Sequence, residues 1–307
     1  MKVSRRDFLQ TASASLSVAW LDRIPAITSP DDLEKTFTEI RANLLEMVNE
    51  ERAVGRVQAL AMDEFATQIA NGHALDMANG EFASHWGRDG RKAYHRYSFA
   101  GGTDATAENI SAADNTWSMK TSDLKQDSAY LHVRLYQEKP PYDGHRKTIL
   151  APQHTHVGFG LAIEKLRLRL VELFVSRYVE VAPVKRTAKP GEKLSFAGKL
   201  LTRNHLLNSV EIFYEPMPKP PELSWLREPR SYALPAESKV LRPRLQMPYT
   251  YVDRTSGDVD VWSDGRFRAP VSLFKREPGI YTIVAWIRKN ASEKAFPATE
   301  VCIEAIS

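Results

Sequence analysis

Apolar residues recur at intervals of three or four along the first part of the chain, a spacing that predicts helices with one buried face. The first helix can be capped by Ser29 or Asp31, and Gly80 marks the end of the second. The residues between Trp86 and Gly102 are rich in Gly, Arg and Tyr and predict an ordered loop. Helices are predicted from about residue 30 to 48, from 63 to 80, at 107–113 and at 128–137.

The hydrophobic period changes to two in the second half of the chain, which predicts strands. Apolar and polar residues alternate in two runs, 155–163 and 166–175, which are separated by Glu164-Lys165 and predict a hairpin. After Val184 the helical period disappears, and turn signals such as Ser263-Asp264-Gly265 separate short β runs. This pattern favours an all-β immunoglobulin-like sandwich. Its strands are predicted at 193–201, 209–215, 248–253, 258–262, 279–288 and 298–305.

The two patterns predict an α+β protein with two domains, and a chain of 307 residues is long enough for both to bury a core. We place the first domain at residues 31–182 and the β-sandwich at 183–307. The Pro-rich residues 216–221 lie within the second domain and are interpreted as a surface loop rather than as a recognition motif.

The first 30 residues are set apart from both domains. Ser4-Arg5-Arg6-Asp7-Phe8-Leu9 precedes a charge-free, weakly apolar stretch over residues 11–21. This arrangement resembles a twin-arginine export signal, which predicts a periplasmic or extracellular protein. The alternative interpretation is a basic N-terminal helix of a cytoplasmic protein.

Composition narrows the classes of partner. The chain has 42 basic and 38 acidic residues, so its net charge is only +4. The basic residues are scattered among the acidic ones and form no cluster, so nucleic-acid binding is not expected. The chain has no run of eighteen apolar residues after its start, so an integral membrane protein is not expected either. The single cysteine, Cys302, lies in an alternating apolar stretch and is interpreted as a small buried residue. We expect a monomer.

Two histidines stand in contexts that suit chemistry. His85 and His145 each follow a small residue on a predicted loop. A loop imidazole can present its ring nitrogens to a cleft, as metal binding or proton transfer requires. The alternative is that each is an ordinary surface or hydrogen-bonding histidine.

The chain also resembles the CAP superfamily, which comprises cysteine-rich secretory, antigen 5 and pathogenesis-related 1 proteins. The similarity covers about residues 38 to 180, and the order and spacing of its segments agree with the family. Six segments carry the resemblance: Leu44–Arg52, Ala70–Gly80, Ser84-His85, Ala107-Glu108-Asn109-Ile110, Gly144-His145-Arg146 and His156–Gly160.

The resemblance implies an α-β-α sandwich whose cleft is lined by two histidines and two acidic residues. Carried over to this sequence, these are His85, Glu108 and His145, and the fourth position stays open. Glu138, seven residues before His145, is the first candidate for it, and Asp127 is a weaker alternative.

Two imidazoles with one or two carboxylates suit a divalent cation such as zinc. We therefore expect a secreted protein that binds a divalent metal, with a small lipid or cell-wall ligand as its partner and the β-sandwich as a spacer or adhesion module. One alternative is a metal-dependent hydrolase of peptides or cell-wall material, with Glu108 or Glu138 as general base. Another is a structural envelope protein, in which Glu108 and the histidines only tie loops together.

Aromatic residues near His85 have two interpretations. They can form a wall that contacts a sugar or lipid, or they can pack the loop against its own domain. The residues concerned are Trp86, Tyr94, Tyr97 and Phe99.

Overall fold

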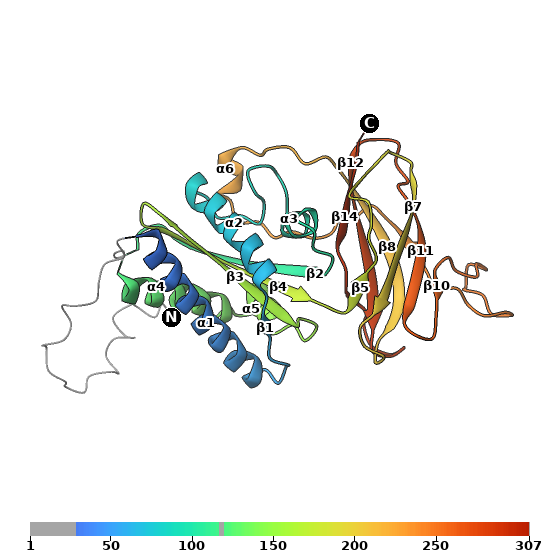
Figure 1. Cartoon of the computed structure of the whole chain (residues 1–307), viewed down its shortest axis with the longest axis horizontal. Coiled ribbons are helices and arrows are strands. Elements are labelled where there is room, and N and C mark those ends of the chain that lie inside the picture. Colours follow the sequence, from blue (N-terminus) through green and yellow to red (C-terminus); the bar gives the residue numbers. More distant parts are fainter. Residues whose placement is uncertain (1–28, 117–119, 307) are drawn as a thin grey trace, which may run out of the picture.

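A four-stranded sheet with strand order β1-β3-β4-β2 lies at the centre of the first domain (Figure 1). The computed structural model describes residues 29–116 and 120–306, so the predicted export signal lies almost wholly outside the described residues. β1 pairs with β3 in parallel, and the other pairs are antiparallel. The strands are β1 (Ala61–Met62), β2 (Ala105–Ala113), β3 (His156–Glu164) and β4 (Arg167–Ser176).

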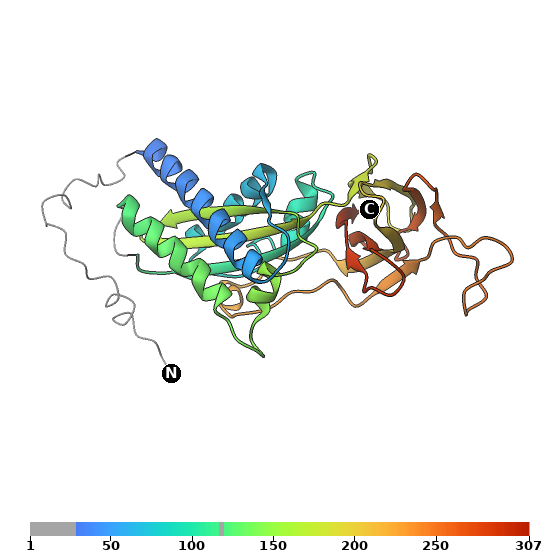
Figure 2. The ribbon, with the colours of Figure 1, turned by 90° about the horizontal axis from the view of Figure 1, so that it is seen from below.

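Helices cover both faces of this sheet, because successive side chains of a strand point to opposite sides. Leu170 and Phe174 of β4 pack in the same core as α1 and α4, whereas Val171 and Leu173 pack with α2 and α3. Figure 2 shows the two long helices α1 and α4 side by side on one face of the sheet. The helices are α1 (Pro30–Val54), α2 (Glu64–Gly80), α3 (Ala93–Phe99), α4 (Thr121–Tyr136) and α5 (Gly144–Ile149).

The second domain consists of two sheets that share one apolar core. One sheet has the order β10-β11-β7-β5, and the other has the order β6-β14-β12-β8-β9 with β13 beside β12. Phe196, Phe267, Tyr281 and Ile303 are among the buried residues contributed by the two sheets. The elements are β5 (Val179–Val181), β6 (Thr187–Ala188), β7 (Lys193–Leu200), β8 (Leu206–Pro216), α6 (Leu223–Leu226), β9 (Ser238–Leu241), β10 (Asp260–Val261), β11 (Arg266–Ser272), β12 (Gly279–Arg288), β13 (Phe296–Pro297) and β14 (Val301–Ala305).

Residues 107–113 are a strand and not the predicted helix. They lie within β2, which pairs with β4 from Ala105–Ser176 to Ala113–Leu168. Ala and Glu favour helices in isolation, but pairing with a buried strand outweighs that weak local preference. A second prediction was also wrong. Residues 86–102 were predicted to form a loop, and the structure contains the short helix α3 there.

The β region also differs from prediction in detail. Residues 248–253 form no strand, whereas β9 and β11 were not predicted. β5 (residues 179–181) pairs with β7, so strand pairing groups it with the second domain, just before the predicted boundary at residue 183. Two packed sheets agree with a β region after the first domain, and the immunoglobulin-like topology stays a prediction.

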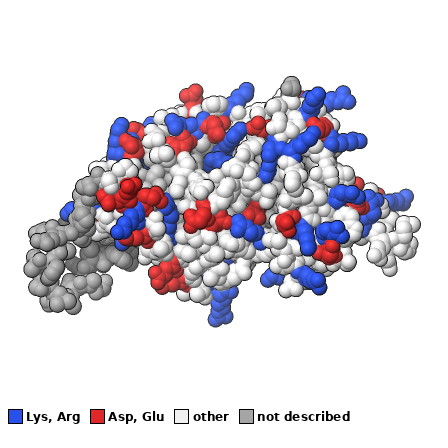
Figure 3. Space-filling model, viewed as in Figure 1, with Lys and Arg blue, Asp and Glu red and all other residues white. Residues whose placement is uncertain are grey.

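The two domains meet along β8 and β14 of the second domain and α3 and β2 of the first. The backbone N–H of Cys302 donates to Ser98 Oγ at 2.7 Å, and Lys92 and His95 both contact the carboxylate of Glu215. Cys302 is fully buried beside Tyr94, as its sequence context predicts. On the face seen in Figure 3, basic and acidic side chains are intermingled. Among the described residues, no helix is long and apolar enough to cross a membrane.

Glu300, a buried residue at this interface, is expected to make the stability of the protein depend on pH. It is buried, and its Oε2 accepts hydrogen bonds from the N–H and the hydroxyl of Thr106 at 2.8 and 2.9 Å. Burial raises its pKa from 4.5 to about 7, although these bonds oppose the shift. An acid whose pKa is raised on folding costs stability as the pH rises from 4.5 through 7.

Glu300→Gln, which keeps an acceptor for Thr106, is therefore expected to be more stable than the wild type at pH 8 by about 1–2 kcal/mol. The gain should vanish at pH 4.5, where the wild-type carboxyl is already protonated. Urea unfolding at both pH values measures the difference. If Glu300→Gln changed the free energy of unfolding by the same amount at pH 8 and pH 4.5, Glu300 would not titrate between these values.

Candidate functional site

The first half of the candidate site joins His85 to Glu108. His85 lies on the loop before α3 and Glu108 lies on β2, and His85 Nδ1 is 3.0 Å from Glu108 Oε1. Arg96 on α3 donates from Nη2 to Glu108 Oε2 at 2.5 Å and from Nη1 to the carbonyl of His85 at 3.0 Å. Both oxygens of the Glu108 carboxylate are therefore engaged.

The ionisation of Glu108 follows from these contacts. Its side chain is 2% exposed, and burial alone would raise the pKa of the carboxyl group. The Arg96 guanidinium, His73 and the hydrogen bond from His85 outweigh burial and lower the pKa to about 2. Glu108 is thus a carboxylate at neutral pH, and Nδ1 of His85 is the protonated nitrogen that donates to it.

The second half of the site joins His145 to Glu138. His145 is the second residue of α5, and Glu138 follows α4. His145 Nδ1 is 2.6 Å from Glu138 Oε1, and the backbone N–H of His145 donates to Glu138 Oε2 at 3.0 Å. Glu138 thus fixes both the imidazole and the start of the short helix that carries it.

The two halves meet at the outer edge of β2. Glu108 and Asn109 are consecutive in this strand, so their side chains lie on opposite faces of the sheet. Glu108 holds His85 on the α3 side, and Asn109 Nδ2 donates to the carbonyl of His145 at 3.2 Å on the α5 side. The ring centroids of His85 and His145 are 6.5 Å apart. β2 therefore brings together histidines that are 60 positions apart in the chain.

The structure places all four candidate residues in two carboxylate–imidazole pairs. Within the described part of the chain, no group of three or more His, Cys, Asp and Glu side chains is arranged to hold a metal ion. The carboxylates of Glu108 and Glu138 are bonded to Nδ1 of their histidines, so the nitrogens left to bind a ligand are Nε2 of His85 and His145. Asp127, the weaker candidate for the fourth position, lies on α4.

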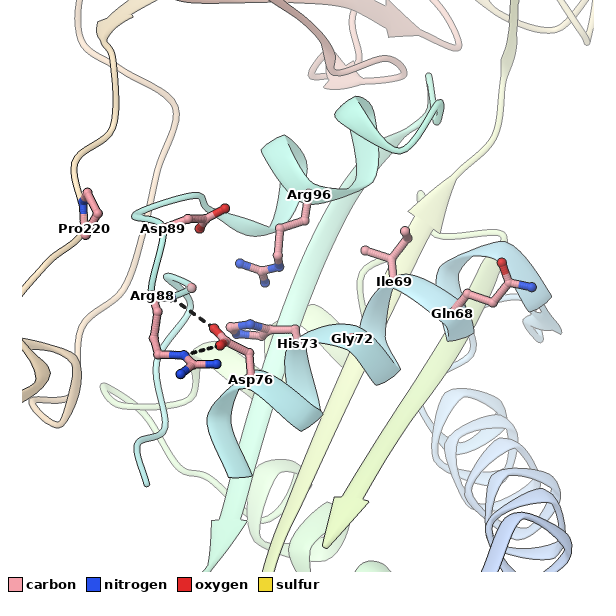
Figure 4. A pocket seen from close by; sticks show the side chains of 10 residues that line it. Gln68, Ile69, Gly72, His73, Asp76, Arg88, Asp89, Arg96 and Pro220 are labelled. Carbon is pink, nitrogen blue, oxygen red and sulfur yellow. Dashed lines mark hydrogen bonds and ion pairs between the residues drawn. The ribbon is translucent and has the colours of Figure 1, made fainter. Parts of the chain in front are cut away.

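Arg96 also lines a pocket of about 650 Å³. Figure 4 shows α2 supplying His73 and Asp76 to it, while Arg88 and Arg96 approach from the loop and from α3. Neither His85 nor His145 lines this pocket. His73, predicted as a core residue of its helix, is buried, and its Nε2 contacts the Ser84 carbonyl at 2.7 Å.

Among the aromatic residues near His85, Tyr94 and Tyr97 are buried and pack the α3 segment, which favours the packing interpretation for them. The residue that lies against His85 is Tyr232 from the second domain, with ring centroids 4.9 Å apart. Neither Tyr232 nor Arg96 was predicted from the sequence. The sequence signals available were the Arg-rich stretch around α3 and an aromatic residue after the Pro-rich segment.

Comparisons with known proteins bear on the same region of the chain. Residues 45–175 match the model of the CAP family, described as the cysteine-rich secretory protein family. No curated protein matches the chain.

Among solved structures, an extracellular protein with an SCP domain from Bacillus anthracis is 20% identical, with a TM-score of 0.38 and coverage of 49% of this chain and 44% of that one. An outer surface protein from Borrelia burgdorferi is 14% identical, with a TM-score of 0.35 and coverage of 49% and 96%. A cysteine-rich secretory protein from Staphylococcus aureus is 17% identical, with a TM-score of 0.30 and coverage of 46% and 39%. The chain thus spans less than half of the Bacillus and Staphylococcus proteins. The family match identifies residues 45–175 of this chain as a CAP domain.

Proposed function

We propose that this is an exported binding protein whose CAP domain takes a divalent cation between His85 and His145. The observation that carries the proposal is that each imidazole has its Nδ1 bonded to a carboxylate, Glu108 or Glu138. A histidine whose Nδ1–H is held by a carboxylate offers the lone pair of Nε2, and the carboxylate makes that nitrogen more basic. Carboxylate–histidine pairs of this kind commonly support metal ions such as zinc.

The distance between the rings fits this role with a small adjustment. Imidazole nitrogens bind zinc at about 2.0–2.1 Å, so the ring centroids of two ligands on one tetrahedral ion lie roughly 5 Å apart. The observed separation is 6.5 Å. We expect His145, whose side chain is 32% exposed, to move toward His85, whose side chain is 9% exposed. Two protein nitrogens leave the other coordination positions to water or to a bound ligand.

The contacts do not favour hydrolysis with Glu108 as general base. A general base needs a free oxygen within reach of the proton that it takes. Both oxygens of Glu108 are already bonded, one to His85 and one to Arg96. Both oxygens of Glu138, the other candidate base, are likewise engaged, one by the imidazole and one by the backbone N–H of His145. We therefore propose binding and not turnover, with a small envelope or cell-wall ligand completing the shell of the cation.

Zinc titration by calorimetry tests the proposal. We expect the wild type to bind one zinc ion and both His85→Ala and His145→Ala to lose that site. Glu138→Gln should weaken binding by about tenfold, because a carboxylate that orients a metal-bound histidine typically contributes 10–100-fold to affinity.

His156→Gln, a half-buried histidine on β3 outside the pair, is the matched control and should bind as the wild type does. Thermal unfolding of each variant shows whether the fold is intact. The structural envelope protein would be the better interpretation if the wild type bound no zinc. It would also be the better interpretation if His85→Ala and His145→Ala bound zinc as tightly as the wild type does.

A further inference from the structure

The segment between β8 and β9, residues 217–237, leaves the second domain and lies on the CAP domain before it returns. We call it the strap. Figure 1 shows its short helix α6 beside α2, with extended chain leading back to the β-sandwich at both ends. Leu226 is 1% exposed within the core of α2 and α3, and the Trp225 ring is 5.2 Å from that of Trp86. Arg227 Nε also donates to the carbonyl of Glu81 at 3.1 Å. The strap is thus anchored by packing and not only by its ends.

Tyr232 is the strap residue that reaches the histidine pair. Its ring centroid is 4.9 Å from that of His85 and 6.4 Å from that of Trp86. Its hydroxyl oxygen accepts the backbone N–H of Glu108 at 3.1 Å. One side chain of the second domain therefore contacts both members of the His85–Glu108 pair.

Contacts from the second domain also cover part of the open edge of the CAP sheet. In the part of the chain that the structure describes, β2 is an edge strand with β4 as its one neighbour in the sheet, so the N–H groups on its outer side need partners from elsewhere. Glu300 accepts the N–H of Thr106, and Tyr232 accepts the N–H of Glu108, two positions further along the same side. Both partners come from the second domain, which covers the β2 edge on the approach to the histidines.

The result is a site that is closed at one end. The side chains of His85 and Glu108 are 9% and 2% exposed, whereas those of His145 and Glu138 are 32% and 24% exposed. We propose that Tyr232 is the wall of the histidine site on the His85 side, so that ligands approach only from the His145 side. The second domain is then a part of the binding site and more than a spacer or adhesion module.

This wall restricts the class of ligand. The site accepts a compact group, such as a hydrated cation with a small oxyanion or the end of a polymer chain. It excludes a chain that would lie across both histidines. The assignment of Tyr232 does not depend on the cation, because it rests on the position of the ring over His85.

Labelling of individual histidines by diethyl pyrocarbonate, read by peptide mass spectrometry on the full chain, tests this assignment. In the wild type we expect His145 to react and His85 to be protected. In Tyr232→Ala the reaction of His85 should rise to a rate comparable with that of His145. Tyr232→Phe keeps the ring and should keep His85 protected.

Internal controls separate loss of the wall from loss of the fold. His73 and His154 are buried within the CAP domain and should stay unlabelled in every variant. Tyr249→Ala removes an exposed tyrosine of the second domain and should leave all rates unchanged. Protection of His85 in Tyr232→Ala, with His73 and His154 also protected, would overturn the proposal. Exposure of His85 in Tyr232→Phe would also overturn it, because the ring would then not be the barrier.

Discussion

Replacing Arg52 by methionine is expected to lower the free energy of unfolding by about 3–5 kcal/mol, since several buried or partly buried carbonyl groups would lose their donor at about 1–3 kcal/mol each. Arg52 is fully buried near the end of α1. Nε donates to the carbonyl of Gln58 at 2.7 Å, and Nη1 donates to those of Ile149 and Ala151 at 2.6 and 3.1 Å. Burial lowers the pKa of Arg52 to about 10, so the guanidinium is still charged at neutral pH.

Urea unfolding followed by circular dichroism measures this effect. Arg134→Met, on the exposed side of α4, is the matched control and should change stability by less than about 0.5 kcal/mol. Because Ile149 is the last residue of α5, the helix that carries His145, and Ala151 follows it, the Arg52 variant should also disturb the candidate site. A loss no larger than that of Arg134→Met would show that the carbonyls find other partners.

His132→Gln is expected to lower stability by about 3–5 kcal/mol at neutral pH, because it leaves two carboxylates without their buried cation. His132 on α4 lies between Glu172 and Glu51, with Nδ1 2.6 Å from Glu172 and Nε2 3.0 Å from Glu51. Burial opposes the charge, but the two carboxylates outweigh it and raise the pKa of His132 to about 10. The imidazole is therefore a cation in the folded protein at neutral pH.

The pH dependence follows from the raised pKa. A histidine whose pKa rises on folding contributes its full stability below its ordinary value of about 6.5, and the contribution is lost as the pH rises through about 10. The difference between the wild type and His132→Gln should therefore shrink from pH 6 to pH 10. Unfolding free energies measured at several pH values check this, and a constant difference would contradict a charged His132.

Local pattern was sufficient for elements that carry strong periodicity. The hairpin of β3 and β4 was predicted, as was β12, because buried strands of nine or ten residues give a clear signal. β2 was predicted as a helix because Ala-Glu-Asn-Ile has no strand preference of its own, and its conformation depends on pairing with β4. Such a contact is not encoded within the segment.

Some residues of the candidate site were predicted from the sequence, and others were found only in the structure. His85, Glu108 and His145 came from the resemblance to the CAP superfamily, and Glu138 came from its position seven residues before His145. Arg96 lies on a helix that was predicted as a loop, so its approach to Glu108 could not be derived. Tyr232 is 124 residues from Glu108, and only the docking of a second domain brings them together.

That separation along the chain sets an order of assembly. Glu108 leaves the ribosome long before Tyr232, so the nascent CAP domain has no cover over β2 until the β-sandwich has been synthesised. During that interval the bare strand edge can pair with a neighbouring nascent chain. A protein truncated at residue 182 would keep that edge permanently, and it would be expected to self-associate and to have its histidines open on both sides.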